Sequence, residues 1–122
     1  MLPSGHRMRR RDDFTLAVRR GRRAGRPNVV VHLLHREGDP GAAGPPLVGF
    51  IVARTVGNAV VRNSVRRRLR HQVRAHLDRL PAGSLLVVRA NPAAGKARPD
   101  ELAADLESAL DRLLRPASKG RR

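Results

Sequence analysis

The sequence predicts an α+β fold in which a small sheet is covered by helices. Apolar, β-branched runs at 29–34, 47–53 and 84–89 are typical of buried strands. Apolar residues recur every three or four positions over 59–80 and 100–114, which indicates amphipathic helices. The 122 residues, about 40% of them apolar, suit one domain with a real core. This mixture of helices and strands points to α+β.

The N-terminal part is predicted to begin with a basic arm over residues 1–11. Asp12 is a good N-cap for a first helix, and Gly21 is placed to close it. Residues 22–27 read as a turn or a short edge strand before the run at 29–34. The Gly- and Pro-rich stretch 37–46 is a loop. The chain order is therefore helix, two or three strands, helix, strand, helix.

The helix predicted from about Ala59 to Leu80 follows Asn58, a good N-cap, and Pro81 stops it. Its apolar stripe is Val61, Val65, Leu69, Val73 and Leu77. The last helix, 100–114, contains the acidic residues Asp100, Glu101, Asp105, Glu107 and Asp111. Residues 116–122 are a flexible basic tail.

Charge is the strongest signal of function. Lys and Arg number 26 against 10 Asp and Glu, for a net charge of +16. All the basic residues except Lys96 and Lys119 are arginines, whose planar fork of donors fits phosphate. A polyanion is the expected partner. A cationic binder of membrane surfaces is the alternative, but the stripe of Val and Leu is typical of a core-facing helix face.

The helix over 59–80 carries seven of the 26 basic residues. At 100° per residue, one row beside the stripe contains Arg62, Arg66, Arg70 and Arg74. Asn63 and Arg67 lie one row further on, and Arg68 flanks the stripe on its other side. No acidic residue lies within 62–77. A solvated charged face is the ordinary explanation, but such faces usually mix signs, so the pattern favours RNA or DNA.

The stretch GNAVVRNSVRRRLR, residues 57–70, closely resembles the signature of the bacterial ribonuclease P protein component. Arg62, Asn63, Arg67 and Arg70 match it, and Arg66 fills the basic position before Arg67. Ser64 departs from the usual third arginine. RRRDDF near the start and GFIVARTVGNAV before the arginines also fit the family in order and spacing, so the resemblance covers about residues 7–115.

The resemblance implies one ribonuclease P protein domain over 1–122 with an α-β-β-β-α-β-α sandwich and a left-handed βαβ crossover (ribosomal protein S5 domain 2-like). It implies binding of the catalytic RNA by Asn58, Arg62, Asn63, Arg66, Arg67, Arg68 and Arg70. It implies a cleft between the first helix and the sheet for the 5′ leader of precursor tRNA, lined by Phe14, Phe50, Arg54, Arg9 and Arg10. Thr55 stands where a second lysine is common. Either Phe is otherwise an ordinary core residue.

The sequence offers no catalytic site of its own. Acidic residues are few outside the last helix, and Asp12 and Asp13 are explained as a helix start. The histidines show no ligand spacing with a nearby carboxylate: His6, His32, His35, His71 and His76. The resemblance implies that the RNA subunit with Mg²⁺ performs the hydrolysis, so the endoribonuclease is the ribonucleoprotein.

The expected partners are the ribonuclease P RNA and precursor tRNA, with no membrane and no obligate protein partner. The absence of cysteine fits a reducing compartment, and MLPSGHRMRRRDDF lacks the apolar region of a secretory signal, so we expect a cytoplasmic protein. Two alternatives stay open. One is a ribosomal or ribosome-associated RNA-binding protein, and the other is a stand-alone metal nuclease.

Overall fold

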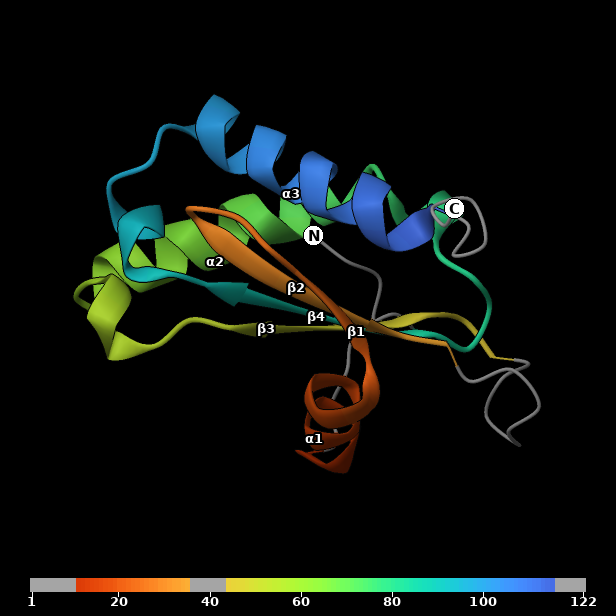
Figure 1. Ribbon diagram of the computed structural model, residues 1–122. Helices are drawn as coiled ribbons and strands as arrows, with labels where there is room; N and C mark the ends of the chain where they lie inside the picture. Colours follow the sequence, from red (N-terminus) through yellow and green to blue (C-terminus); the bar gives the residue numbers. More distant parts are fainter. Residues whose placement is uncertain (1–10, 36–43, 116–122) are drawn as a thin grey trace.

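A computed structural model describes residues 11–35 and 44–115 of the chain (Figure 1). In this part the elements are α1 (Arg11–Arg20), β1 (Arg22–Gly25), β2 (Val29–Leu34), β3 (Leu47–Ile51), α2 (Ala59–Arg74), β4 (Leu85–Ala90) and α3 (Pro99–Leu114). The predicted order of helices and strands is confirmed, including β1 as a short edge strand. The basic arm with Arg9 and Arg10, most of the loop 37–46 and the tail 116–122 lie outside the described residues.

The four strands form a mixed sheet in the order β1-β2-β4-β3. β2 is antiparallel to both β1 and β4. β3 is parallel to β4, with Gly49 opposite Val87, and α2 connects these two strands. A parallel pair needs such a crossover because its strands start at the same edge of the sheet. The expected α-β-β-β-α-β-α sandwich is thereby confirmed.

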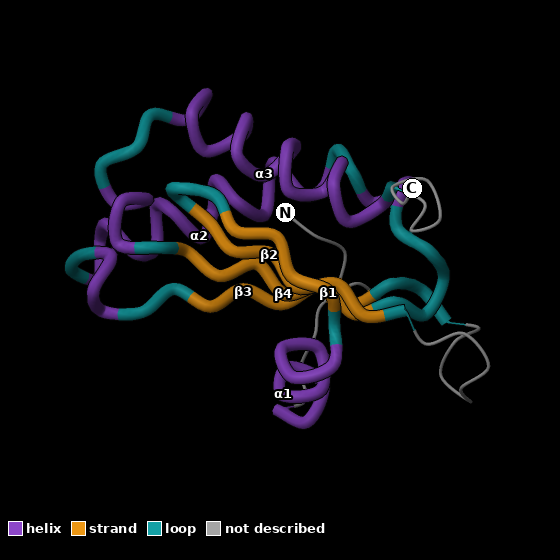
Figure 2. The backbone as a smooth tube through the Cα atoms, viewed as in Figure 1, coloured by secondary structure: helices purple, strands orange, loops and turns teal. Residues whose placement is uncertain are grey.

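The sheet separates two layers of helices, with α2 and α3 on one face and α1 on the other (Figures 1 and 2). The alternation of side chains along each strand explains this arrangement. Leu86 and Val88 of β4 belong to the large core under α2 and α3. Leu85 and Val87 belong to a smaller core under α1. The central strand β4 is therefore apolar from Leu85 to Val88, because helices cover both of its faces there.

Two helix boundaries differ from the prediction. α1 begins at Arg11, so Asp12 lies in the first turn and is not the N-cap; a carboxylate still suits that end of the helix dipole. α2 ends at Arg74, and a separate 3-10 turn follows at Leu77–Arg79. That turn keeps Leu77 and Leu80 on the core, so the apolar spacing continues after the α-helix has ended.

Gly21, where α1 turns into the sheet, is needed for a close approach. Its N–H donates to the carbonyl of Ala17 at 2.9 Å. A Cβ at this position would lie 2.4 Å from the Ala17 oxygen and 2.9 Å from the Leu33 oxygen. The glycine predicted to close the helix thus also lets α1 sit directly on β2.

Candidate RNA-binding surface

The start of α2 is fixed by two residues. The Oδ1 atom of Asn58 accepts a hydrogen bond from the Val61 N–H at 2.9 Å, so Asn58 is the predicted N-cap. Gly57 has φ 156°, and a Cβ there would lie 2.8 Å from the Val61 side chain. The cap uses the acceptor of Asn58, which leaves its amide N–H groups as the atoms with which it can contact RNA.

One stripe anchors α2 to the sheet. Val65, Leu69 and Val73 are at most 1% exposed and belong to the large core. Val61 packs against the same core at the first turn. Because these residues recur every four positions, they lie on one face of α2, and the remaining faces of the helix point away from the core.

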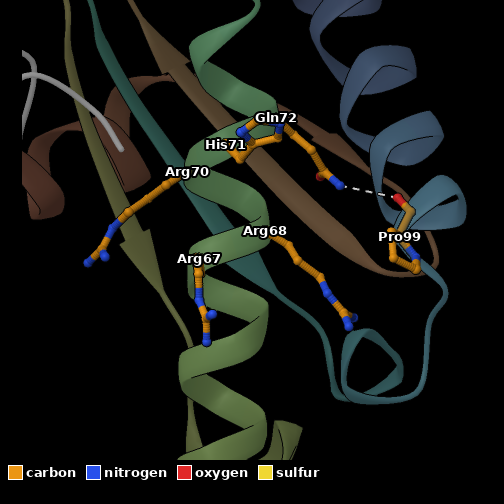
Figure 3. A pocket seen from close by; sticks show the side chains of 6 residues that line it. All are labelled: Arg67, Arg68, Arg70, His71, Gln72 and Pro99. Atoms are coloured by element: carbon orange, nitrogen blue, oxygen red, sulfur yellow. Dashed lines mark hydrogen bonds between the residues drawn. The ribbon is translucent and has the colours of Figure 1, made fainter.

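The outer side of α2 consists of three rows of polar side chains. The outermost row is exposed: Asn63, Arg67 and His71. A half-buried row lies on each side of the stripe, Arg62, Arg66 and Arg70 on one and Ser64, Arg68 and Gln72 on the other. Figure 3 shows Arg68 reaching toward the start of α3 while Arg70 extends from the opposite side of the helix. The predicted rows are therefore present, and they form a broad cationic surface.

Several contacts hold these arginines in place. The Nη1 atom of Arg66 donates to Oδ1 of Asn63 at 3.2 Å, and both residues are among those predicted to bind RNA. The Nε atom of Arg62 is buried without a hydrogen-bond partner among the described residues, so its stem lies against the protein. α2 itself contains no acidic residue. Like charges four residues apart repel by a few tenths of a kcal/mol each, so an anionic partner would stabilise this surface.

Three carboxylates of α3 have partners outside α2. Asp111 pairs with Arg79, and Asp100 pairs with Arg98 at 3.6 Å. The Oδ2 atom of Asp105 accepts from both the N–H and the side-chain amide of Asn28, each at 2.9 Å. These contacts keep the negative charge of the protein on the α3 side.

The predicted leader-cleft residues do not share one face. Phe14 packs with Ala17, Leu85 and Val87 in the core under α1. Phe50 packs against the core under α2 and α3, on the other side of the sheet. Strand alternation explains the separation, because Leu47, Gly49 and Ile51 face α1 and the residues between them face away. Arg54 and Thr55 are exposed in the 3-10 turn Arg54–Val56 that follows β3.

The structure adds a basic patch on the α1 face that the sequence reasoning missed. Arg23 of β1 lies opposite His32 of β2 in the sheet, and Arg89 of β4 lies opposite Val30. His32 is 6% exposed, and its Nδ1 has no hydrogen-bond partner among the described residues. Burial lowers the pKa of His32, and the charges of Arg23 and Arg89 lower it further. Residues 23, 32 and 89 become neighbours only through strand register, although their alternation was visible in the sequence.

Within residues 11–35 and 44–115, no three His, Cys, Asp or Glu side chains gather where they could hold a metal ion. Over the same ranges, no helix is long and apolar enough to cross a membrane.

The fold and the arginine surface define a class of small, basic α+β proteins built to bind a polyanion. The family model named Ribonuclease P matches residues 2–114. The ribonuclease P protein component of Streptomyces griseus is 58% identical over 118 residues, covering 93% of this chain and 96% of that protein. The counterpart from Corynebacterium diphtheriae is 46% identical over 117 residues, covering 94% and 98%. The chain belongs to the ribonuclease P protein family.

Solved structures agree with this fold. The RNase P protein of Staphylococcus aureus matches with a TM-score of 0.76 at 22% identity, covering 88% of this chain and 94% of that chain. The RNase P protein of Thermotoga maritima matches with a TM-score of 0.69 at 24% identity, covering 90% and 96%. Family membership favours the ribonuclease P assignment over a ribosomal protein.

Proposed function

We propose that this chain is the RNA-binding subunit of ribonuclease P and that α2 binds the catalytic RNA. The observation that carries the proposal is the separation of charge. The arginine rows of α2 stand on a buried stripe, while the carboxylates Asp105 and Asp111 of α3 bind Asn28 and Arg79. Successive side chains of a row are about 5–6 Å apart, so one helix face can contact several phosphates of a folded RNA.

The 5′ leader of precursor tRNA is proposed to cross the α1 face of the sheet. Phe14 would offer a ring at the edge of α1, and stacking on a ring tolerates any base. The exposed Arg23 and Arg89 would attract the leader phosphates, with Arg54 at the end of β3 as a further contact. Phe50 is left out of this cleft because it packs on the opposite face. Arg9 and Arg10 remain predicted contacts outside the described residues.

The chemistry is assigned to the RNA subunit. Mg²⁺ held by that RNA would supply the activated water that attacks the phosphodiester and leaves a 5′-phosphate on the mature tRNA. The residues of this chain would lower the repulsion between two RNA backbones and position the leader. Such a role needs no carboxylate cluster in the protein. We propose that the protein acts in the cytoplasm together with its RNA.

The test is reconstitution with a bacterial ribonuclease P RNA at low Mg²⁺, with precursor tRNA as substrate. We expect cleavage at the 5′ end to depend on both subunits, and the complex to prefer tRNA with a leader over mature tRNA. Cleavage by the protein alone would instead identify a metal nuclease. Equal binding of extended and mature tRNA would contradict the proposed binding of the 5′ leader. It would then favour the alternative of a ribosomal RNA-binding protein.

A further inference from the structure

A notch of about 500 Å³ lies between α2 and the beginning of α3. Its lining residues are Arg67, Arg68, Arg70, His71, Gln72 and Pro99 (Figure 3). The volume falls within the range of about 300–1,000 Å³ typical of small-ligand sites. The notch therefore has room for a molecular group larger than a phosphate.

One hydrogen bond holds the two walls together. The Nε2 atom of Gln72 donates to the carbonyl oxygen of Pro99 at 3.1 Å, which links α2 to the first residue of α3 (Figure 3). The Oε1 atom of the same amide is buried and has no hydrogen-bond partner among the described residues. An acceptor left in this state is unfavourable, and a donor brought by a ligand would relieve it after a small rotation of the side chain.

The chemistry of the notch limits what can occupy it. Its surface is mostly carbon, and three arginines are among the residues that line it: Arg67, Arg68 and Arg70. A bare phosphate would contact the arginines but leave the apolar surface of the notch uncovered. An apolar helix of another protein would cover that surface but bury the arginine charges without offering them a partner. A nucleotide satisfies both, because its base is flat and apolar on its faces while its phosphate is anionic. Arginine planes commonly stack on unpaired RNA bases.

We propose that the notch binds one unstacked base of the RNA that lies on α2, with its face against Pro99 and Arg68 and its phosphate at Arg67. The proposal rests on the proposed function, because α2 must bind RNA for a base to reach the notch. The buried Oε1 of Gln72 would accept a hydrogen bond from an N–H group on the edge of that base, and each of the four bases offers such a group when it is unpaired.

The test compares two substitutions of exposed prolines at helix starts. Pro99→Ala removes the ring from the notch, and Pro92→Ala makes the same change at the 3-10 turn Pro92–Gly95, outside the notch. We expect Pro99→Ala to weaken binding of a bacterial ribonuclease P RNA about threefold to tenfold, with an unchanged salt slope because no charge is lost. Pro92→Ala should bind like the original protein. Equal affinities for all three proteins would overturn the proposal.

The base itself is identified on the RNA. Chemical probing with and without protein should reveal an unpaired nucleotide whose protection is lost in Pro99→Ala. Removing that base should weaken binding of the original protein but have no further effect on Pro99→Ala, because both changes delete the same contact. Additive losses would show that the base lies elsewhere, and a changed oligomeric state in Pro99→Ala would show that the notch takes a second copy.

Arg67→Ala separates this proposal from the broader one. If Arg67→Ala weakens RNA binding and Pro99→Ala does not, α2 binds RNA and only the notch assignment fails. If neither substitution has an effect, the RNA surface itself lies elsewhere on the protein.

Discussion

Replacing Arg62 and Arg67 together by alanine tests the arginine surface most directly. Arg67 is in the exposed outer row of α2, and Arg62 is in the half-buried row beside it. Each phosphate contact contributes about 0.9 to the slope of log affinity against log salt on duplex RNA or DNA, and about 0.7 on single strands. Loss of two contacts should therefore flatten the slope by about 1.4–1.8.

The flattened slope gives a measurable change in affinity. Between 50 and 200 mM salt, the ratio of the RNA affinity of the original protein to that of the double variant should fall about sevenfold to twelvefold. Filter binding or fluorescence anisotropy with a bacterial ribonuclease P RNA, repeated across this salt range, measures it. Circular dichroism must first show that the variant is folded.

A matched control removes the same charge elsewhere. Arg79 pairs with Asp111 of α3, and Arg112 is exposed in the last turn of α3, at the opposite end of that helix from the notch. Exposed ion pairs are worth about 0–1 kcal/mol, so replacing both arginines by alanine should leave the fold intact. Both double variants lower the net charge of +16 by two. If the control flattens the slope as much as Arg62→Ala with Arg67→Ala, the protein binds RNA through its overall charge, and the reasoning about α2 is refuted.

Three further outcomes are expected. Sulfate should raise the melting temperature more than chloride of equal ionic strength does. At a sulfate concentration ten times its dissociation constant, binding adds about 1.4 kcal/mol to the free energy of unfolding. An equal rise of the melting temperature in both salts would show that the arginine array is not preformed. Phe14→Leu should spare catalytic-RNA affinity but lower the preference for tRNA with a leader about fivefold or more; equal losses for extended and mature tRNA would contradict this. Because the pKa of His32 is lowered in the folded state, the unfolded chain binds a proton more readily, so stability should fall as pH drops below about 6.5 and level off above it. Urea titrations should show this fall reduced in His32→Gln but not in His35→Gln, and an unchanged fall in His32→Gln would exclude His32 as the cause.

The elements could be predicted because their periodicities are strong and local. The β-branched run at β2 and the four-residue spacing in α2 left little choice of structure. The end of α2 could not be read in the same way, because Leu77 and Leu80 keep the apolar spacing through a 3-10 turn. Helix ends depend on a few hydrogen bonds, which periodicity does not report.

The candidate site divides along the same line. The rows of α2 follow from 100° per residue and one buried stripe, so the sequence alone was enough to place Arg62, Arg67 and Arg68. Placing Phe50 required knowing which residues of β3 face α1. The sequence allowed that step, because side chains alternate between the two faces of a strand. The patch at Arg23 and Arg89 and the notch beside Pro99 required strand register and the docking of α3, which arise only from tertiary packing.

Ser64 shows how one departure from the family pattern acts on this surface. It shares a row with Arg68 and Gln72, on the flank of α2 that leads to the notch. An arginine at 64 would stand one turn from Arg68 and add a repulsive pair of a few tenths of a kcal/mol to that flank. Serine removes the repulsion and one cation together, while the row on the other flank keeps Arg62, Arg66 and Arg70. Arg68 is therefore the one cation in the row of Ser64, Arg68 and Gln72, so Arg68→Ala would remove all positive charge from that row.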